Sequence, residues 1–293
     1  MWKDKQGNTW YKGNLHMHTS RSDGRLSYEQ AVRTYREAGY DFIAVTDHWT
    51  YNAGSEENGF LILSGCEYNL GNTPQEKVFH IVGFGMEHPT GLRAEENPSP
   101  QDVIDAIRAA GGLAELAHPA WSMTRVDDAL ALIGLCGTEI YNTVSGPPWN
   151  CRAYSGDFID LCGAAGRLFP CLAVDDAHFY AGDETASFVY VKAKELTREA
   201  ILQAIAAGDF FASQGPKLSV RAEDGICMVE CSPAEQIIFY NDSVWCGDRV
   251  AFGHGITHGE SRILPHMTFE RVEVVDRLGR RAWASPIPVN NKE

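Results

Sequence analysis

Two histidines one residue apart, His16 and His18, begin the set of side chains that could do chemistry, and Asp23 follows five residues after His18. On a β-strand alternate side chains share a face, so both imidazoles point one way while Leu15 and Met17 point the other way. Two imidazoles at this spacing can bind one metal ion at a strand end. They can equally be structural histidines with local hydrogen bonds. The pair alone does not distinguish between these two roles.

Further polar residues occur at or just beyond the ends of later apolar runs, with one histidine inside a run. These residues are Asp47, His48, Glu67, His80, His118, Asp176 and His178. In a β/α barrel the carboxyl ends of the strands converge on one mouth, where catalytic groups collect. Structural histidines would rarely coincide with strand ends so often, so the pattern predicts one shared site.

The elements that would position these residues are short apolar runs alternating with helical patterns, which is typical of β/α units. The runs are residues 15–18, 42–47, 60–63, 78–84, 113–116, 138–141 and 172–174. Helices are expected after the capping residues Ser27, Ser99 and Thr197. Glycines at 39, 111 and 208 mark where those helices end.

From Lys217 onward the pattern changes to alternating strands such as "LSVRAE", "QIIFYN" and "RVEVVD", and no helical pattern remains. We therefore expect two domains. Residues 1–213 form the α/β domain that carries the polar set, and residues 214–293 form a small all-β domain of the sandwich type.

Composition limits the possible functions. The formal net charge of −14 disfavours a protein that gains affinity by neutralising a nucleic-acid backbone. No apolar run is long enough to span a membrane, and the first residues lack the apolar core of a signal peptide. Eight cysteines without framework spacing indicate reduced thiols, so we expect a cytoplasmic protein.

The order of the motifs resembles the PHP (polymerase and histidinol phosphatase) superfamily of metal-dependent phosphoesterases. The motifs are H-x-H with S-D-G, T-D-H, G-x-E, a lone His, H-P and D-x-H, over about residues 10–212. The stretches "ILQAIAAGDFFASQGPKL" and "AWASPIPV" are similar to the carbaryl-hydrolase-like branch, in which a barrel carries a β appendage. The resemblance implies a distorted seven-stranded β/α barrel.

The resemblance also implies nine ligands for two or three divalent ions. The first ion would bind His16, His18, Glu67 and Asp176, the second Glu67, His80 and His118, and the third Asp23, His48 and His178. Glu67, Asp176 and His178 are the residues expected to act in catalysis. Imidazoles and carboxylates without a thiolate suit Zn, Mn or Fe. Many members of the family have histidine where this chain has Asp23.

Such ions can generate a nucleophilic water with a pKa of about 7 and stabilise an in-line displacement. Three divalent ions against three carboxylates leave a local charge of about +3, which suits a small anionic substrate such as a phosphomonoester or nucleotide phosphate. Arg21 and Arg125 can clamp a phosphate or be solvated. Glu139 and Asn142 can line the mouth or simply pack tightly.

Three alternatives stay open. The same metal site could hydrolyse a carbamate or carboxylic ester. A phosphodiesterase or exonuclease is a further possibility, which the net charge of −14 disfavours. The chain could also be a non-catalytic metal-containing module that binds a partner, although such a module has no need of nine ligands. The sequence does not indicate an oligomeric state.

Overall fold

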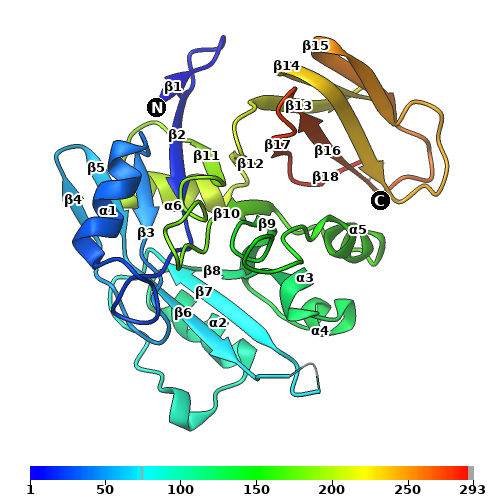
Figure 1. Ribbon diagram of the computed structural model, residues 1–293. Coiled ribbons are helices and arrows are strands. Elements are labelled where there is room, and N and C mark those ends of the chain that lie inside the picture. The colour runs from blue at the N-terminus through cyan, green and yellow to red at the C-terminus, as the bar shows by residue number, and fades with distance from the viewer. Residues whose placement is uncertain (74, 290–293) are drawn as a thin grey trace. The chain divides into compact units, whose positions relative to one another are not determined.

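The computed structural model describes residues 1–73 and 75–289, which divide into two compact units (Figure 1). Unit 1 comprises Met1–Ser155 and Leu172–Phe210. Unit 2 comprises Gly156–Cys171 and the chain from Phe211 onward. The domain boundary after residue 213 stays a prediction.

One sheet of unit 1 has three parallel strands at its centre, β2 (Thr9–Asn14), β3 (Phe42–Ala44) and β5 (Phe60–Leu63). Antiparallel strands are added at its sides. They are β1 (Trp2–Lys3) and β11 (Phe188–Lys192) on β2, and β4 (Ser55–Glu57) on β5. Parallel strands bring the carboxyl ends of β2 and β3 to the same edge, and two of the polar motifs begin there.

The second sheet has the strand order β10-β9-β8-β7-β6. Its strands are β6 (Gly65–Leu70), β7 (Phe79–Phe84), β8 (Leu113–Leu116), β9 (Leu135–Asn142) and β10 (Cys171–Val174). Isolated bridges from Met17 to Ala177 and from His48 to Glu67 join residues beyond β2 and β3 to this part of the chain. The described strands thus form two sheets linked at strand ends, and the closed seven-stranded barrel stays a prediction.

The predicted strands at residues 60–63 and 113–116 are confirmed residue for residue as β5 and β8. The first run differs, because β2 ends at Asn14 and His16 and His18 lie just beyond it. Leu15 and Met17 are both fully buried, but they pack in two different apolar clusters. The prediction that these two side chains share one face was therefore wrong, because the chain leaves the regular strand after Asn14. Strand β6 was not predicted, and it places Glu67 inside a strand rather than after one.

The three predicted helices are confirmed as α1 (Tyr28–Glu37), α2 (Pro100–Ala109) and α6 (Arg198–Ala206). Ser27 and Gln30 form the expected capping box, and Gly39 follows α1 with φ +76°. Three short helices were not predicted because they are too short to show a period. They are η1 (Ala94–Glu96), α3 (Pro119–Ser122) and α4 (Val126–Leu130).

Unit 2 contains one helix and a set of antiparallel strands. They are α5 (Gly156–Ala164), β12 (Phe210–Ser213), β13 (Leu218–Glu223), β14 (Ile226–Asn241), β15 (Val250–Arg262), β16 (Phe269–Val275), β17 (Arg281–Trp283) and β18 (Ile287–Pro288). Arg271 of β16 is fully buried and makes two hydrogen bonds of 2.7 and 2.8 Å to the carboxylate of Asp160 in α5.

The sequence predicts an all-β sandwich here, whereas the strands of this unit are hydrogen-bonded into one sheet with α5 packed against it. The helix was not expected in this unit because α5 comes from residues before the predicted boundary. All eight cysteines are free thiols. Within the described part of the chain, no helix combines the length and the apolar character needed to cross a membrane.

Candidate metal centre

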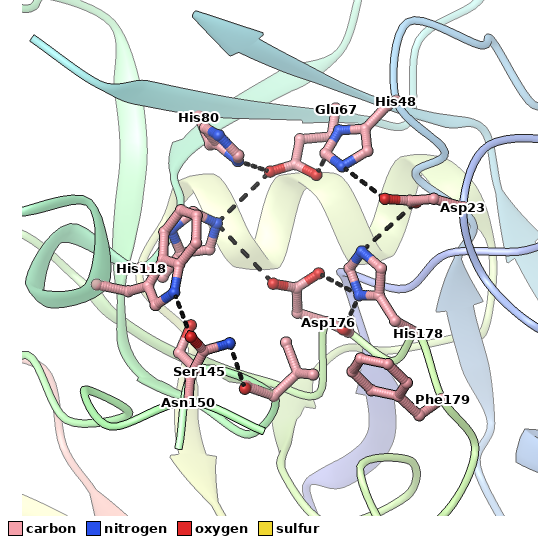
Figure 2. A pocket seen from close by; sticks show the side chains of 12 residues that line it. Asp23, His48, Glu67, His80, His118, Ser145, Asn150, Asp176, His178 and Phe179 are labelled. Carbon is pink, nitrogen blue, oxygen red and sulfur yellow. Dashed lines mark hydrogen bonds and ion pairs between the residues drawn. The ribbon is translucent and has the colours of Figure 1, made fainter. Parts of the chain in front are cut away.

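The nine predicted ligands gather in unit 1, although they come from six different stretches of chain. Figure 2 shows seven of them, all except His16 and His18. His16 and His18 follow β2, His48 follows β3, and His118 follows β8. Glu67 and His80 lie within the paired strands β6 and β7, and Asp176 and His178 follow β10. The fold thus brings residues up to 162 positions apart into one cluster, most of them from strand ends and two from within strands.

The tightest group is formed by His16, His18, Glu67 and Asp176, all of them buried. The Nε2 atoms of His16 and His18 lie 3.2 Å apart. Each lies 3.0–3.2 Å from Glu67 Oε2 and from Asp176 Oδ1. Four donor atoms at such spacings around one centre lie about 2 Å from it, the length of a zinc–nitrogen or zinc–oxygen bond.

Glu139 fixes which nitrogen of His16 faces this group. His16 Nδ1 lies 2.7 Å from Glu139 Oε1, and an ionised carboxylate only accepts hydrogen bonds. Nδ1 therefore carries a proton, and Nε2 is the nitrogen directed at Glu67 and Asp176. A carboxylate behind a histidine in this way is the usual support of a metal ligand.

Glu67 connects the first group to a second. Its Oε2 faces His16 and His18, while its Oε1 lies 2.7 Å from His80 Nδ1 and 3.6 Å from His118 Nε2. His118 Nδ1 contacts the hydroxyl of Ser122 at 3.0 Å, which leaves Nε2 directed at Glu67. One carboxylate thus presents an oxygen to each of two donor groups, as a carboxylate that bridges two ions must do.

The third group is wider and more exposed. Asp23 lies 3.5 Å from His178 Nε2, 3.6 Å from His18 Nδ1 and 3.7 Å from His48 Nε2. Its side chain is 54% exposed, in contrast to the buried carboxylates of the first group. His178 Nδ1 donates to the carbonyl of Asp176 at 2.7 Å, so Nε2 is the nitrogen that faces Asp23.

Asp47 holds the loop that carries Asp23 and does not contact an imidazole. Its Oδ1 accepts hydrogen bonds from the Thr19 N–H (2.7 Å) and the Ser22 hydroxyl (2.8 Å). Its Oδ2 accepts from the Thr19 hydroxyl (2.8 Å) and the Asn52 amide (2.9 Å). The loop geometry therefore depends on one buried carboxylate.

Two of the proposed ligands adopt a backbone conformation that non-glycine residues avoid. His118 has φ +26° and Asp176 has φ +53°. Such conformations cost of the order of 1–3 kcal/mol and cluster at functional sites. The bent backbone at these two strand ends directs the side chains of His118 and Asp176 into the cluster of proposed ligands.

The electrostatics of the cluster fit metal ions. Burial lowers the pKa of His16, but Asp176, Glu67 and Glu139 outweigh burial and raise that pKa well above its usual value. The pKa of His18 rises to about 9 because Asp176 and Glu67 likewise outweigh burial. Protons thus compensate the carboxylates in the metal-free protein, and divalent ions can replace those protons.

Unpartnered buried atoms support the same fit. Glu67 Oε2, Asp176 Oδ1 and His48 Nδ1 are buried and have no hydrogen-bond partner in the described chain. Burial also lowers the pKa of His48, which favours the neutral imidazole that a metal ion needs. This buried His/Asp/Glu cluster is suitable for a multinuclear metal site.

Glu115 was not among the residues predicted from the sequence; it lies fully buried on β8, next to His16 of the first group. Its carboxylate, that of Glu139 and a nitrogen of His16 lie within 4.8 Å of one another. Neither Glu115 oxygen has a hydrogen-bond partner in the described chain. Burial, followed by the charge of Glu139, raises the pKa of Glu115 well above its usual range and favours the uncharged acid.

A cavity of about 240 Å³ opens onto the cluster (Figure 2). Seven of the nine predicted ligands line it, while His16 and His18 lie buried beneath. Its other lining residues are Trp121, Val144, Ser145, Asn150 and Phe179. No sequence motif singled out the last four of these, because they lie on loops whose course periodicity does not predict.

Arg21 and Arg125 lie outside this cavity. Arg21 donates to Asn52 Oδ1 at 2.6 Å, and its guanidinium lies over the ring of Tyr28 at 4.1 Å. Arg125 precedes α4 and lines a separate small hollow together with Lys77. Phosphate binding by the two arginines stays a prediction to which the geometry adds no support.

Of the comparisons with known proteins, one solved structure supports this description, at the level of the fold. No family model matches the chain. An uncharacterized protein from Methanocaldococcus jannaschii is 27% identical over 145 residues, covering 45% of this chain and 81% of the relative. An amidohydrolase from Chromobacterium violaceum covers 58% of this chain and 89% of its own at 16% identity, with a TM-score of only 0.40.

A two-domain protein from Bacteroides vulgatus is more informative. It is described as containing a predicted PHP-like metal-dependent phosphoesterase, and it is similar over 94% of this chain and 93% of its own. The TM-score is 0.54 and the identity 16%. The chain therefore has a mixed α/β, two-domain fold like that of this PHP-like structure.

Proposed function

We propose that the protein is a metal-dependent hydrolase that cleaves a small phosphomonoester at a site for two or three divalent ions. The observation that carries this proposal is Glu67, whose two buried oxygens face two separate groups of imidazoles. A carboxylate in that position serves a binuclear site, and binuclear sites suit in-line phosphoryl displacement.

The ligands would be divided as the resemblance to the PHP superfamily implies. His16, His18, Glu67 and Asp176 would hold one ion, Glu67, His80 and His118 a second, and Asp23, His48 and His178 a third. Bound ions would neutralise charge on the phosphoryl oxygens and acidify a water molecule. Donors of nitrogen and oxygen without a thiolate favour zinc, manganese or iron.

The chain's own residues would position and protonate the reacting groups. Glu139 orients His16, and the Asn142 amide donates to Asp176 Oδ2 at 3.1 Å. His178 lines the cavity with Nδ1 already bonded to a carbonyl, so its Nε2 is available to bind an ion or to pass a proton to the leaving group. Glu67, Asp176 and His178 are the catalytic residues of the proposal.

The finer inferences from the sequence belong to the same proposal. They are a closed seven-stranded barrel, a relationship to the carbaryl-hydrolase-like branch, a small phosphorylated partner and a cytoplasmic location. A nucleic-acid substrate fits less well, because the net charge is −14 and Asp23 is exposed at the cavity.

Hydrolysis of a carbamate or carboxylic ester on the same site is the second candidate. It is favoured by the five lining residues that are not predicted ligands, since none of them carries a charge. A neutral ester would therefore meet no unpaired charge in the cavity apart from the ligand residues.

Phosphate release by protein freed of metal and reloaded with manganese, zinc or iron tests the proposal. A panel of phosphomonoesters would be assayed beside phenyl acetate and an aryl carbamate. Glu67→Gln and Asp176→Asn keep the side-chain shape and should lower kcat by at least about 10²-fold. Glu57→Gln, on a surface ion pair with Arg36, is the matched control and should change nothing. Turnover that survives complete removal of metal would contradict the proposal.

A further inference from the structure

The cavity has two chemically different walls. One is built from proposed ligands, and the other from Trp121, Val144, Ser145, Asn150 and Phe179. Among the described residues that line the cavity, none is a lysine or an arginine. A substrate group that points away from the ligands therefore meets aromatic and aliphatic surface, one hydroxyl and one amide.

This second wall is held in place by its own hydrogen bonds. The Ser145 N–H donates to Asn142 Oδ1 at 3.0 Å, and the Asn150 N–H donates to the carbonyl of Gly146 at 2.8 Å. The Trp121 indole donates to Asn150 Oδ1 at 3.1 Å, and the Asn150 amide donates to the carbonyl of Val144 at 3.3 Å (Figure 2). The polar groups of Asn150 are thus engaged with protein.

The aromatic side of the wall extends beyond the cavity. The ring of Phe179 stacks on that of Trp149, with centroids 6.1 Å apart and an interplanar angle of 7°. Arg25 lies over the Phe179 ring at 5.0 Å but is not a lining residue. Flat apolar surface of this kind favours an uncharged, preferably planar, group.

The negative charge around the cavity also disfavours a negatively charged leaving group. Asp23 is the exposed carboxylate of the cavity, and the net charge of the chain is −14. The first negative group of a substrate would be compensated by bound ions. A second one, placed on the leaving group, would point away from the ions and toward the wall, where none of the described lining residues is a lysine or an arginine, so it would be desolvated without a compensating charge.

We propose that this site selects phosphomonoesters whose leaving alcohol or phenol is compact and uncharged. The inference rests on the proposed function and narrows it, because it excludes bisphosphates and carboxylated phosphate esters as good substrates. In the reaction, the oxygen of water bonds to phosphorus while the ester P–O bond breaks. The leaving oxygen takes up a proton, and inorganic phosphate is released.

Phenyl phosphate and 4-carboxyphenyl phosphate form a matched pair of substrates for the metal-loaded wild-type enzyme. The carboxylate makes the phenol a better leaving group, so slower cleavage of the carboxylated ester cannot come from intrinsic reactivity. We expect kcat/KM for phenyl phosphate to be higher by about tenfold or more. Equal values, or a preference for the carboxylated ester, would overturn the inference while leaving the phosphatase activity established.

Asn150 allows the charge of the wall to be changed at one exposed position. Asn150→Arg should raise the relative kcat/KM of the carboxylated ester by about fivefold, and Asn150→Asp should lower it further. Arg36→Ala, which removes a cation from the surface ion pair with Glu57, is the control and should leave the ratio unchanged. A ratio that is the same in both Asn150 variants as in wild type, or that changes in Arg36→Ala, would show that the wall does not select.

Failure of the proposed function would look different. Phosphate release from neither ester, with metal content confirmed, would overturn the phosphatase proposal and the selectivity inference with it. Phosphate release from both at equal rates would remove only the selectivity.

Discussion

Asn142 links the proposed ligands to the cavity wall by hydrogen bonds. Its Nδ2 donates to Glu139 Oε2 at 2.8 Å and to Asp176 Oδ2 at 3.1 Å. Its Oδ1 accepts from the Ser145 N–H at 3.0 Å. All of these groups are buried, so the loss of one donor would leave carboxylate oxygens without compensation.

Replacing Asn142 should therefore weaken metal binding although none of the proposed ligands is changed. We expect Asn142→Ala to lower the affinity of the first ion by about 10- to 100-fold. Asn142→Asp should lower it more, because it places a third carboxylate against Glu139 and Asp176. Competition with a chromogenic chelator measures the affinity. Asn241→Asp in unit 2 is the control, and equal affinities for all variants would contradict the positioning role.

At the scale of elements, the site depends on the loops that follow strands. The loop after β2 turns back so that Asp23 meets His48 and His178, and Asp47 accepts four hydrogen bonds that maintain this turn. The sequence marked Asp47 only as a polar residue at a strand end. Its partners became known from the fold.

Loss of the Asp47 charge should act on the third group and spare the first. Asp47→Asn keeps the shape of the side chain but cannot accept from all of its donors. We expect the weakest-bound ion to be lost, so the metal content per chain falls on gel filtration while the tightest-bound ion stays. Glu57→Gln serves as the surface control. Unchanged metal content and affinity in Asp47→Asn would show that the loop keeps its conformation without the Asp47 carboxylate.

Strand β16 of unit 2 carries a buried carboxyl group whose ionisation at higher pH destabilises the folded state. Glu270 is fully buried, accepts one hydrogen bond from Asn241 at 3.2 Å, and has no partner for Oε1 in the described chain. Burial raises its pKa from 4.5 to about 7. The folded state thus binds this proton more tightly than the unfolded state, and the contribution to stability falls as pH rises from 4.5 through 7.

Glu270→Gln should remove that pH dependence, because the amide stays neutral. Compared with wild type, the variant should gain stability at pH 8 and gain none at about pH 4. Urea unfolding of both proteins across this range measures the difference in free energy. A difference that stays constant with pH would mean that Glu270 is not the titrating group.

At the scale of the whole molecule, the position of the metal-binding side chains predicts which unit is stabilised by metal ions. The four groups of His, Asp and Glu found among the described residues all lie in unit 1. Metal ions would therefore stabilise unit 1 by binding to its folded state, by about 4 kcal/mol for a free metal concentration of 1,000 Kd.

Metal removal should accordingly affect the two units differently. After treatment with a chelator, amide hydrogen exchange should speed up in β6, β8 and β10 and stay unchanged in β13, β14 and β16. Glu67→Gln, which removes the shared carboxylate, should respond much less to the chelator than wild type. Uniform acceleration across both units would contradict the assignment of the ions to unit 1.

The sequence by itself determined the features that depend on near neighbours. Residue types and spacing predicted a shared site of polar residues at strand ends, and the motif order, through the family resemblance, implied which nine of them are ligands. Capping residues located α1, α2 and α6, because a helix cap is set within a few residues. The strands at 60–63 and 113–116 were found from apolar runs, which are equally local.

Tertiary structure alone decided the contacts between distant segments. His16 meets Glu139 across 123 residues, and Arg271 meets Asp160 across 111, so neither partner could be read from a local pattern. The neutral cavity wall and the addition of α5 to unit 2 were decided in the same way. The physical reason is that burial and pairing depend on which chain ends converge in space, and local periodicity does not encode that convergence.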